Sequence, residues 1–131
     1  LRPRELPPDL STIRFGVTPY LGEELTAKSY APITDYLNDS LGIQVELVLA
    51  KSYGDLIDMV QQKRVDIFLI SPLSYVLAKQ RSPSLRLLAQ ESASGMASYS
   101  AYIVVREDSR AEVLRDLVGK KIAFVDRHST S

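Results

Sequence analysis

The feature that most constrains the fold of this chain is an alternation between two spacings of apolar residues. Segments with an apolar residue at every second position, typical of strands, alternate with segments that repeat every three or four positions, typical of helices. The expected strands are 13–17, 43–49, 65–70, 85–90, 99–106 and 121–125, and the expected helices are 29–41, 52–60, 71–80 and 109–118. Repeated strand–helix–strand order predicts an α/β fold with an open, mainly parallel, doubly wound sheet.

Local signals set the expected helix ends. Three serines stand where helices should begin, because their hydroxyls can accept a hydrogen bond from a first-turn N–H: Ser29, Ser52 and Ser71. Pro32 would then lie in a tolerated first-turn position, and Gly42 just beyond a helix end. The run 65–70 is apolar apart from Asp66, as in strands that helices cover on both faces. We therefore expect it among the central strands.

Composition excludes several classes of protein. No apolar run approaches the roughly 20 residues of a transmembrane helix. The chain has no cysteine and one histidine, which excludes disulfides and thiolate metal sites and argues against a histidine-rich metal site. Sixteen basic and sixteen acidic residues cancel to zero net charge. Without a basic excess or a Lys/Arg cluster, no nucleic-acid partner is expected.

Hydroxyl-rich segments follow four of the expected strands, where open parallel sheets bind their ligands. These segments are 18–20, 51–53, 71–74 and 127–131. Ser129, Thr130 and Ser131 could each donate a hydrogen bond to a different oxygen of a tetrahedral anion, at a helix N-terminus that favours negative charge. On residue type alone, a simple helix cap with solvent-facing neighbours explains the same three residues. Tyr53 and Tyr99 likewise suit either a ligand contact or packing.

An enzyme is hard to build from these residues. Asp126, His128 and Ser129 are the residue types of a hydrolase triad, but triad members normally converge from separate parts of a fold. The Gly-x-Ser-x-Gly turn, the phosphate-binding loop of nucleotide hydrolases and the dinucleotide-binding glycine pattern are all missing. We therefore expect no catalysis and no cofactor.

Three segments together resemble the phosphate/phosphite/phosphonate-binding proteins of ABC importers. They are Ile13–Tyr20, Val65–Tyr75, and Gly119–Asp126 with the following Ser129–Ser131. The resemblance runs in order and with matching spacing from Ile13 to Ser131. It implies a type II periplasmic binding protein, in which two α/β lobes close on an oxyanion about a hinge.

The resemblance also implies site residues and boundaries. The expected ligand-binding residues are Tyr53, Tyr99, Ser129, Thr130 and Ser131, and weaker candidates on the same rim are Tyr20 and Ser71. His128 departs from the family pattern, and its imidazole is expected either to contact the ligand or to face solvent. Residues 1–12, with three prolines, would form an arm, 13–100 the first lobe, and 101–131 the hinge strand and the beginning of a truncated second lobe.

The implied function is non-catalytic binding of a small phosphorus oxyanion (phosphonate, phosphite or phosphate). The protein would work in the periplasm or another extracytoplasmic space, with or without a membrane anchor. Its partner would be the membrane permease of an ABC importer or a fused membrane receptor for which it senses the anion. The alternative is the effector-binding domain of a bacterial transcription regulator with the same fold. A helix-turn-helix segment upstream would favour that alternative.

Overall fold

The computed structural model describes residues 11–92, 98 and 100–130. These residues form two compact units. The first unit contains the described residues up to Leu85 together with His128–Thr130, and the second runs from Arg86 to Arg127. The arm expected at 1–12 lies almost wholly outside the described residues, and the lobe boundaries remain a prediction.

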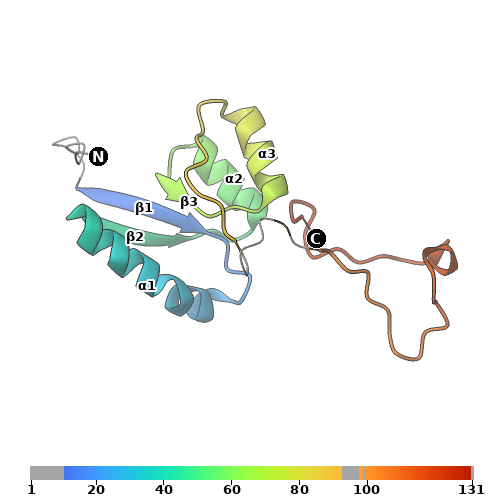
Figure 1. Cartoon of the computed structure of the whole chain (residues 1–131). Helices are drawn as coiled ribbons and strands as arrows, with labels where there is room; N and C mark the ends of the chain where they lie inside the picture. The colour runs from blue at the N-terminus through green and yellow to red at the C-terminus, as the bar shows by residue number, and fades with distance from the viewer. Residues whose placement is uncertain (1–10, 93–97, 99, 131) are drawn as a thin grey trace. The chain divides into compact units, whose positions relative to one another are not determined.

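A three-stranded parallel sheet forms the centre of the first unit. Its strands are β1 (Thr12–Val17), β2 (Gln44–Leu49) and β3 (Ile67–Phe68), in the order β2-β1-β3 (Figure 1). β1 pairs with β2 along its whole length, from Thr12 opposite Gln44 to Val17 opposite Leu49. β1 pairs with β3 through Phe15 opposite Ile67. The predicted parallel pairing is confirmed.

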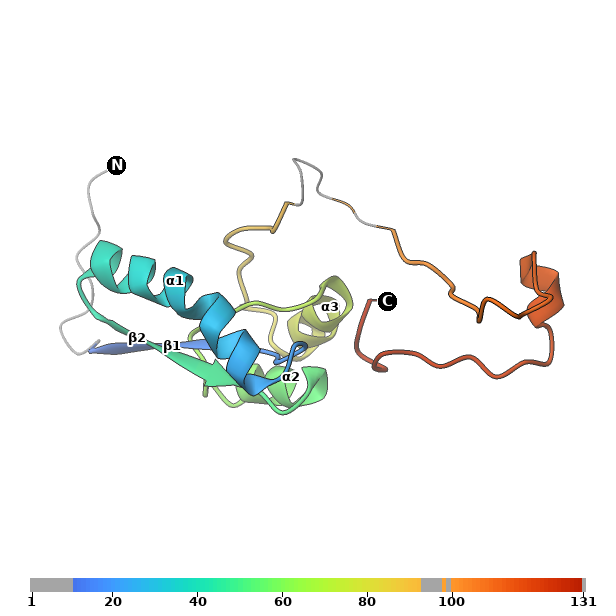
Figure 2. The same ribbon diagram turned by 90° about the horizontal axis from the view of Figure 1, so that it is seen from below.

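Helices cover both faces of this sheet. They are α1 (Glu23–Leu41), α2 (Tyr53–Gln61) and α3 (Pro72–Arg81). The two views show α1 on one face and α2 with α3 on the other (Figures 1 and 2). This arrangement is the predicted doubly wound α/β architecture, because each strand–helix–strand crossover places its helix on a face of the sheet.

Each face of the sheet has its own apolar core. The core on the α1 side contains Phe15, Val17, Tyr30 and Val45. The rings of Phe15 and Tyr30 meet edge to face there, with centroids 6.0 Å apart. The core on the α2 side contains Ala50, Leu56, Met59, Val60 and Val65. Adjacent strand residues point to opposite faces, so one strand contributes to both cores.

Gly16 is where the core on the α2 side approaches the sheet most closely. A Cβ atom at this position would lie 2.8 Å from Cγ1 of Val65 and 3.0 Å from Cδ1 of Leu56. The first distance is shorter than real Cβ contacts allow, so a side chain at position 16 would force its neighbours apart. The glycine near the end of β1 is therefore a packing requirement.

α1 begins earlier than predicted. Ser29 lies inside the helix, where its hydroxyl donates a 2.8 Å hydrogen bond to the carbonyl of Leu25. The prediction that Ser29 caps the helix was wrong, and Pro32 lies in the helix interior. The helix starts after Gly22 with two glutamates in its first turn, and acidic side chains are stabilising at that end. Gly42 ends it in the left-handed conformation, as predicted.

β3 differs from the prediction in length and position. Only Ile67–Phe68 of the expected strand 65–70 pairs, and β1 rather than β3 is central in the described sheet. A strand becomes central only if another pairs with its second edge. Residues 85–90, expected to form the next strand, have no strand structure. The prediction of a central third strand was therefore wrong.

The second unit has little regular structure. Its described residues contain no strand where 99–106 and 121–125 were expected, and the expected helix 109–118 is reduced to the 3-10 turn η1 (Leu114–Leu117). Most of its described large apolar side chains are exposed, at 86% for Val104 and 74% for Phe124. Strands and helices of this length are stabilised mainly by packing, and the exposed apolar side chains described here pack on little of the rest of their unit. Across the residues that the structure describes, no helix is long and apolar enough to span a membrane.

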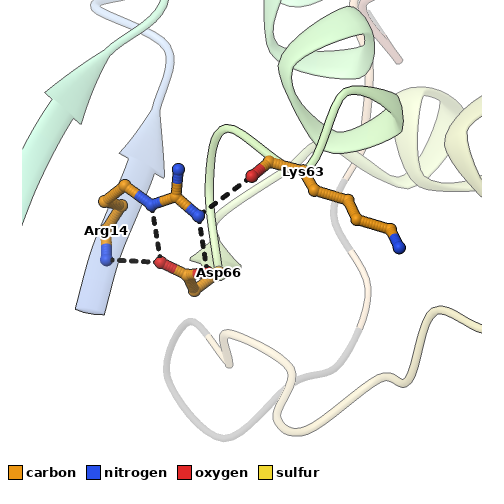
Figure 3. Close-up of polar contacts among 3 residues, drawn as sticks. All are labelled: Arg14, Lys63 and Asp66. Atoms are coloured by element: carbon orange, nitrogen blue, oxygen red, sulfur yellow. Dashed lines mark hydrogen bonds and ion pairs between the residues drawn. The ribbon is translucent and has the colours of Figure 1, made fainter. Parts of the chain in front are cut away.

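An ion pair fastens β1 to the segment that leads into β3. The Arg14 guanidinium contacts both carboxylate oxygens of Asp66 at 2.8 Å and donates to the Lys63 carbonyl at 2.9 Å (Figure 3). The backbone N–H of Arg14 donates a further 2.9 Å bond to the Asp66 carboxylate, and the backbone N–H of Asp66 donates a 2.9 Å bond to the Arg14 carbonyl. The hydrogen bonds from Arg14 lower the pKa of the Asp66 carboxyl below its usual value.

Candidate ligand-binding site

The candidate site lies at the carboxyl edge of the sheet in the first unit. α2 begins four residues after β2 ends, and α3 begins shortly after β3 (Figure 1). Because the strands are parallel, both helices start at the same edge of the sheet. Each helix start presents backbone N–H groups that have no partner within the helix, together with the positive end of the helix dipole.

Ser52 caps the start of α2 as predicted. Its hydroxyl accepts a 3.1 Å hydrogen bond from the backbone N–H of Asp55. The Asp55 carboxylate accepts a 2.7 Å bond from the N–H of Lys51. These two bonds fix the entry into α2 and engage the acidic side chain of its first turn. Tyr53, the first helical residue, is half-buried there.

Ser71 caps the start of α3, also as predicted. Its hydroxyl accepts a 3.4 Å hydrogen bond from the N–H of Ser74, and Pro72 occupies the first turn. Proline suits this position because its missing N–H would have no partner in the helix. The first turn of α3 carries no acidic residue. This helix start is therefore better suited to an anion than that of α1, which carries two glutamates.

The segment His128–Thr130 lies against the start of α3, and it is here called the anion-binding turn after the role that the sequence resemblance implies for Ser129 and Thr130. The Ser74 hydroxyl donates a 2.7 Å hydrogen bond to the carbonyl of His128, and the Ser71 hydroxyl donates to the same oxygen at 3.3 Å. The Leu73 N–H donates a 3.2 Å bond to the hydroxyl oxygen of Thr130. Three bonds thus hold this turn to residues more than 50 positions earlier in the chain.

The direction of these bonds determines which hydroxyl protons a ligand could use. A hydroxyl has one proton to donate and two lone pairs that accept. Ser71 and Ser74 direct their protons to the His128 carbonyl. Thr130 instead accepts a bond from Leu73, and no described residue accepts its proton. The exposed Thr130 hydroxyl can therefore donate to an anion at the start of α3.

The imidazole of His128 lies against the first turn of α2. A Cβ atom built on Gly54 would be 3.3 Å from Cε1 and 3.6 Å from Nδ1 of that ring. It would also be 3.8 Å from the hydroxyl of Ser52. A side chain at position 54 would therefore press on the ring, which would have to move by a few tenths of an ångström. The anion-binding turn is thus bonded to the start of α3, and the ring of its first residue lies beside Gly54 of α2.

The structure brings together part of the predicted site. Ser71, His128 and Thr130 meet at the start of α3, with Ser129 between the last two in sequence, and Tyr53 precedes Gly54, which lies beside the His128 ring. Tyr20 lies on the turn after β1 with 63% of its surface exposed. Tyr99 and Ser131 are outside the described residues. That any of these residues binds a ligand remains a prediction.

Two contributors to this site were missed by sequence reasoning. Ser74 is fully buried and donates the shortest of the three bonds to the anion-binding turn. Gly54 makes room for the His128 ring. The Ser-x-x-Ser spacing at 71–74 was a usable signal for Ser74, because the third position of the first turn lies close to the cap. Nothing local marks Gly54.

A parallel α/β unit with hydroxyls at its carboxyl edge is the architecture of a small-ligand binding lobe. The family model described as "ABC transporter, phosphonate, periplasmic substrate-binding protein" matches residues 15–131 of this chain. The match spans most of the chain, so the chain belongs to this family. The resemblance inferred from the three sequence segments is confirmed.

Two known proteins illustrate the relationship. The chain is 29% identical over 123 residues to the phosphate-import protein PhnD of Mycolicibacterium smegmatis, an alignment that covers 92% of this chain and 38% of that protein. The fold is similar to that of PhnD1 from Prochlorococcus marinus in complex with methylphosphonate, with a TM-score of 0.53 and 19% identity. That superposition covers 56% of this chain and 27% of the other. The chain thus spans well under half the length of either protein.

Proposed function

We propose that this chain forms the anion-binding lobe of an extracytoplasmic solute-binding protein for a small phosphorus oxyanion: phosphonate, phosphite or phosphate. The protein would deliver the anion to the membrane permease of an ABC importer. Family membership supports the ligand class and the transporter, and the relative named for phosphate import agrees with both. In a variant of this proposal, the same lobe is part of the sensor region of a membrane receptor. The gene sequence that flanks this segment would distinguish the two roles.

The observation that carries the proposal is the hydrogen bond from Leu73 to Thr130. It places a hydroxyl with an available proton beside the first turn of α3, where the positive end of the helix dipole attracts negative charge. Ser129 and Ser131 continue the same run of hydroxyls. Three neutral donors would each contribute about 1.5–3 kcal/mol when bonded to a charged oxygen. After the cost of ordering, such a set supports micromolar binding.

Binding without turnover follows from the same chemistry. The polar side chains at the start of α3 are the hydroxyls of Ser71 and Ser74, and both donate to the His128 carbonyl rather than to a base that could activate them as nucleophiles. The one carboxylate of the α2 first turn, Asp55, is bonded to the Lys51 amide. We expect the anion to be recovered unchanged after prolonged incubation with the protein. Conversion of any phosphonate to phosphate would argue for an enzyme instead.

A ligand panel on the full-length gene product tests the proposal. Phosphate, phosphite, methylphosphonate and aminoethylphosphonate are compared by thermal shift and calorimetry, with sulfate as the control. A ligand that binds only the folded state stabilises it by RT ln(1 + [L]/Kd), so the preferred anion gives the largest shift. Micromolar binding of at least one phosphorus oxyanion is expected. Equal, millimolar responses to all five anions would contradict the proposal.

Tyr53 receives a separate test. Its position as the first residue of α2 suits a phenol that donates to the anion, but half-burial suits packing equally well. The Tyr53→Phe variant keeps the ring and removes only the hydroxyl. If the hydroxyl contacts the anion, Kd for the preferred ligand rises about tenfold or more while the melting temperature stays close to that of the parent. An unchanged Kd assigns Tyr53 to packing.

A further inference from the structure

We propose that Ser74 is the positioning residue of the anion site. Its buried hydroxyl would hold the anion-binding turn on α3 so that Thr130 keeps its proton directed to the ligand. This inference rests on the proposed function and extends it to a residue that does not itself contact the anion. Ser74 is assigned this role because its hydroxyl proton is directed to the His128 carbonyl.

The surroundings of Ser74 leave its hydroxyl without another evident purpose. Ser74 is 0% exposed, so the hydroxyl is removed from solvent. A serine inside a helix commonly bonds a carbonyl one turn earlier in the same helix. Ser74 bonds instead to a residue 54 positions later, at 2.7 Å. The helix does not need Ser74 as its cap, because Ser71 already serves that function.

Two attachments on one helix turn determine the position of Thr130. The His128 carbonyl is bonded to Ser74, and two residues later the Thr130 hydroxyl is bonded to the N–H of Leu73. Leu73 and Ser74 are consecutive residues of α3, so the turn is held at both ends by the same rigid element. Loss of the first attachment removes the shorter of the two bonds to the His128 carbonyl and leaves the longer one from Ser71. Thr130 would then lose its fixed orientation at the helix start.

A direct measurement of this docking uses hydrogen exchange at the Leu73 amide in the full-length gene product. This amide lies in the first turn of α3, where N–H groups have no partner within the helix. Its protection therefore reports the bond to Thr130. In the Ser74→Ala variant we expect the Leu73 amide to exchange about three- to tenfold faster, because a change of this size corresponds to the loss of one hydrogen bond. An unchanged rate would overturn the proposal.

Ser29→Ala is the matched control. The Ser29 hydroxyl also donates to a backbone carbonyl at 2.8 Å, but within α1 and away from the site. This variant should leave exchange at Leu73 and anion affinity unchanged. Ser74→Cys serves as a second test if the alanine variant folds poorly, because its thiol keeps a weak donor at the same place. Its exchange rate should fall between those of the parent and of Ser74→Ala.

Affinity measurements separate positioning from a purely structural role. With phosphate or methylphosphonate as the probe, Ser74→Ala should raise Kd about three- to tenfold without a matching drop in melting temperature. If Ser74 acts through Thr130, the Thr130→Val change should weaken binding less in the Ser74→Ala background than in the parent. Full additivity of the two changes would contradict the proposal.

If the parent binds neither anion, the proposed function fails. The exchange rate of the Leu73 amide still shows whether Ser74 holds the turn on α3.

Discussion

The two units of this chain contain similar apolar runs but differ in what those runs contact. In the first unit, Val17, Leu56 and Ile57 are at most 1% exposed, packed between a parallel sheet and its helices. In the second, Val104 and Phe124 lie in equally strand-like runs and are mostly exposed. The comparison shows that an alternating sequence becomes a strand only where a pairing strand and a covering helix are present in the same unit.

The largest expected effect is on amide hydrogen exchange of the 131-residue chain. Amides of β1 can exchange only when the whole unit unfolds. They should therefore exchange at least about a thousandfold slower than in an unfolded chain. Amides of 100–106 have no ladder partner among the described residues and should exchange close to the unfolded rate. Comparable protection in both segments would break the comparison between the two units.

Core truncation gives the next largest effect. Leu56 of α2 is fully buried and faces Gly16 of β1, so Leu56→Ala should lower the free energy of unfolding by about 2–5 kcal/mol. The matched change in the second unit, Leu114→Ala, removes a side chain that is 71% exposed. It should alter the free energy of unfolding by less than about 0.5 kcal/mol. Urea denaturation of both variants measures the difference. Similar losses would mean that the second unit has a core.

Gly16 tests how tightly the core on the α2 side is packed. Gly16→Ala places a methyl 2.8 Å from Cγ1 of Val65 and should destabilise the chain by about 1–3 kcal/mol through overpacking. Val65→Ala removes the obstructing methyl groups. In the double variant the two losses should therefore sum to less than expected for independent sites. Strict additivity in urea denaturation would show that Gly16 is not constrained by Val65.

The smallest expected effect concerns the ion pair at Asp66. Its pKa is lowered in the folded state, so the pair stabilises the fold above the unfolded pKa of about 3.9 and this contribution is lost as the pH falls through the lower folded value. Asp66→Asn should lower the urea midpoint only slightly at pH 7, because both side chains of the pair are partly exposed. The decrease should be smaller at pH 3, where Asp66 of the parent begins to lose its charge. A deficit that grows on acidification would contradict this sign.

A matched pair in the second unit sharpens this result. Arg106 and Asp108 form an ion pair at 2.7 Å, and the hydrogen bond lowers the pKa of Asp108. The two residues are only two positions apart, so their contact does not join distant segments of chain. Asp108→Asn should therefore leave the urea midpoint unchanged at every pH. A shift as large as that of Asp66→Asn would show that the second unit has cooperative structure.

Features set by neighbouring residues were predictable from the sequence. The serine caps of α2 and α3 and the left-handed Gly42 depend on contacts within four residues, and all three predictions were confirmed. Ser29 was assigned wrongly because a serine inside a helix and a serine at its cap have the same local signal. The strand–helix alternation predicted the parallel sheet of the first unit for the same local reason.

Features set by distant contacts were not predictable. The length and edge position of β3 depend on whether residues 85–90 pair beside it. The spacing of apolar residues does not indicate which strands pair. The docking of the anion-binding turn joins Leu73 to Thr130 across 57 residues, and no local pattern records that contact. The role of Gly54 depends on where the His128 ring lies. The candidate residues could be named from the sequence, but their hydrogen-bond directions could not.

The central claim is that a neutral hydroxyl held at the start of α3 binds a phosphorus oxyanion, and Thr130→Val tests it most directly. Valine keeps the branched shape and removes only the hydroxyl, and Thr34→Val, whose hydroxyl bonds within α1, is the matched control. Calorimetry on the full-length gene product should show Kd for the preferred anion raised about 10- to 100-fold by Thr130→Val and unchanged by Thr34→Val. A Thr130→Val protein that binds every anion as tightly as the parent would contradict the account.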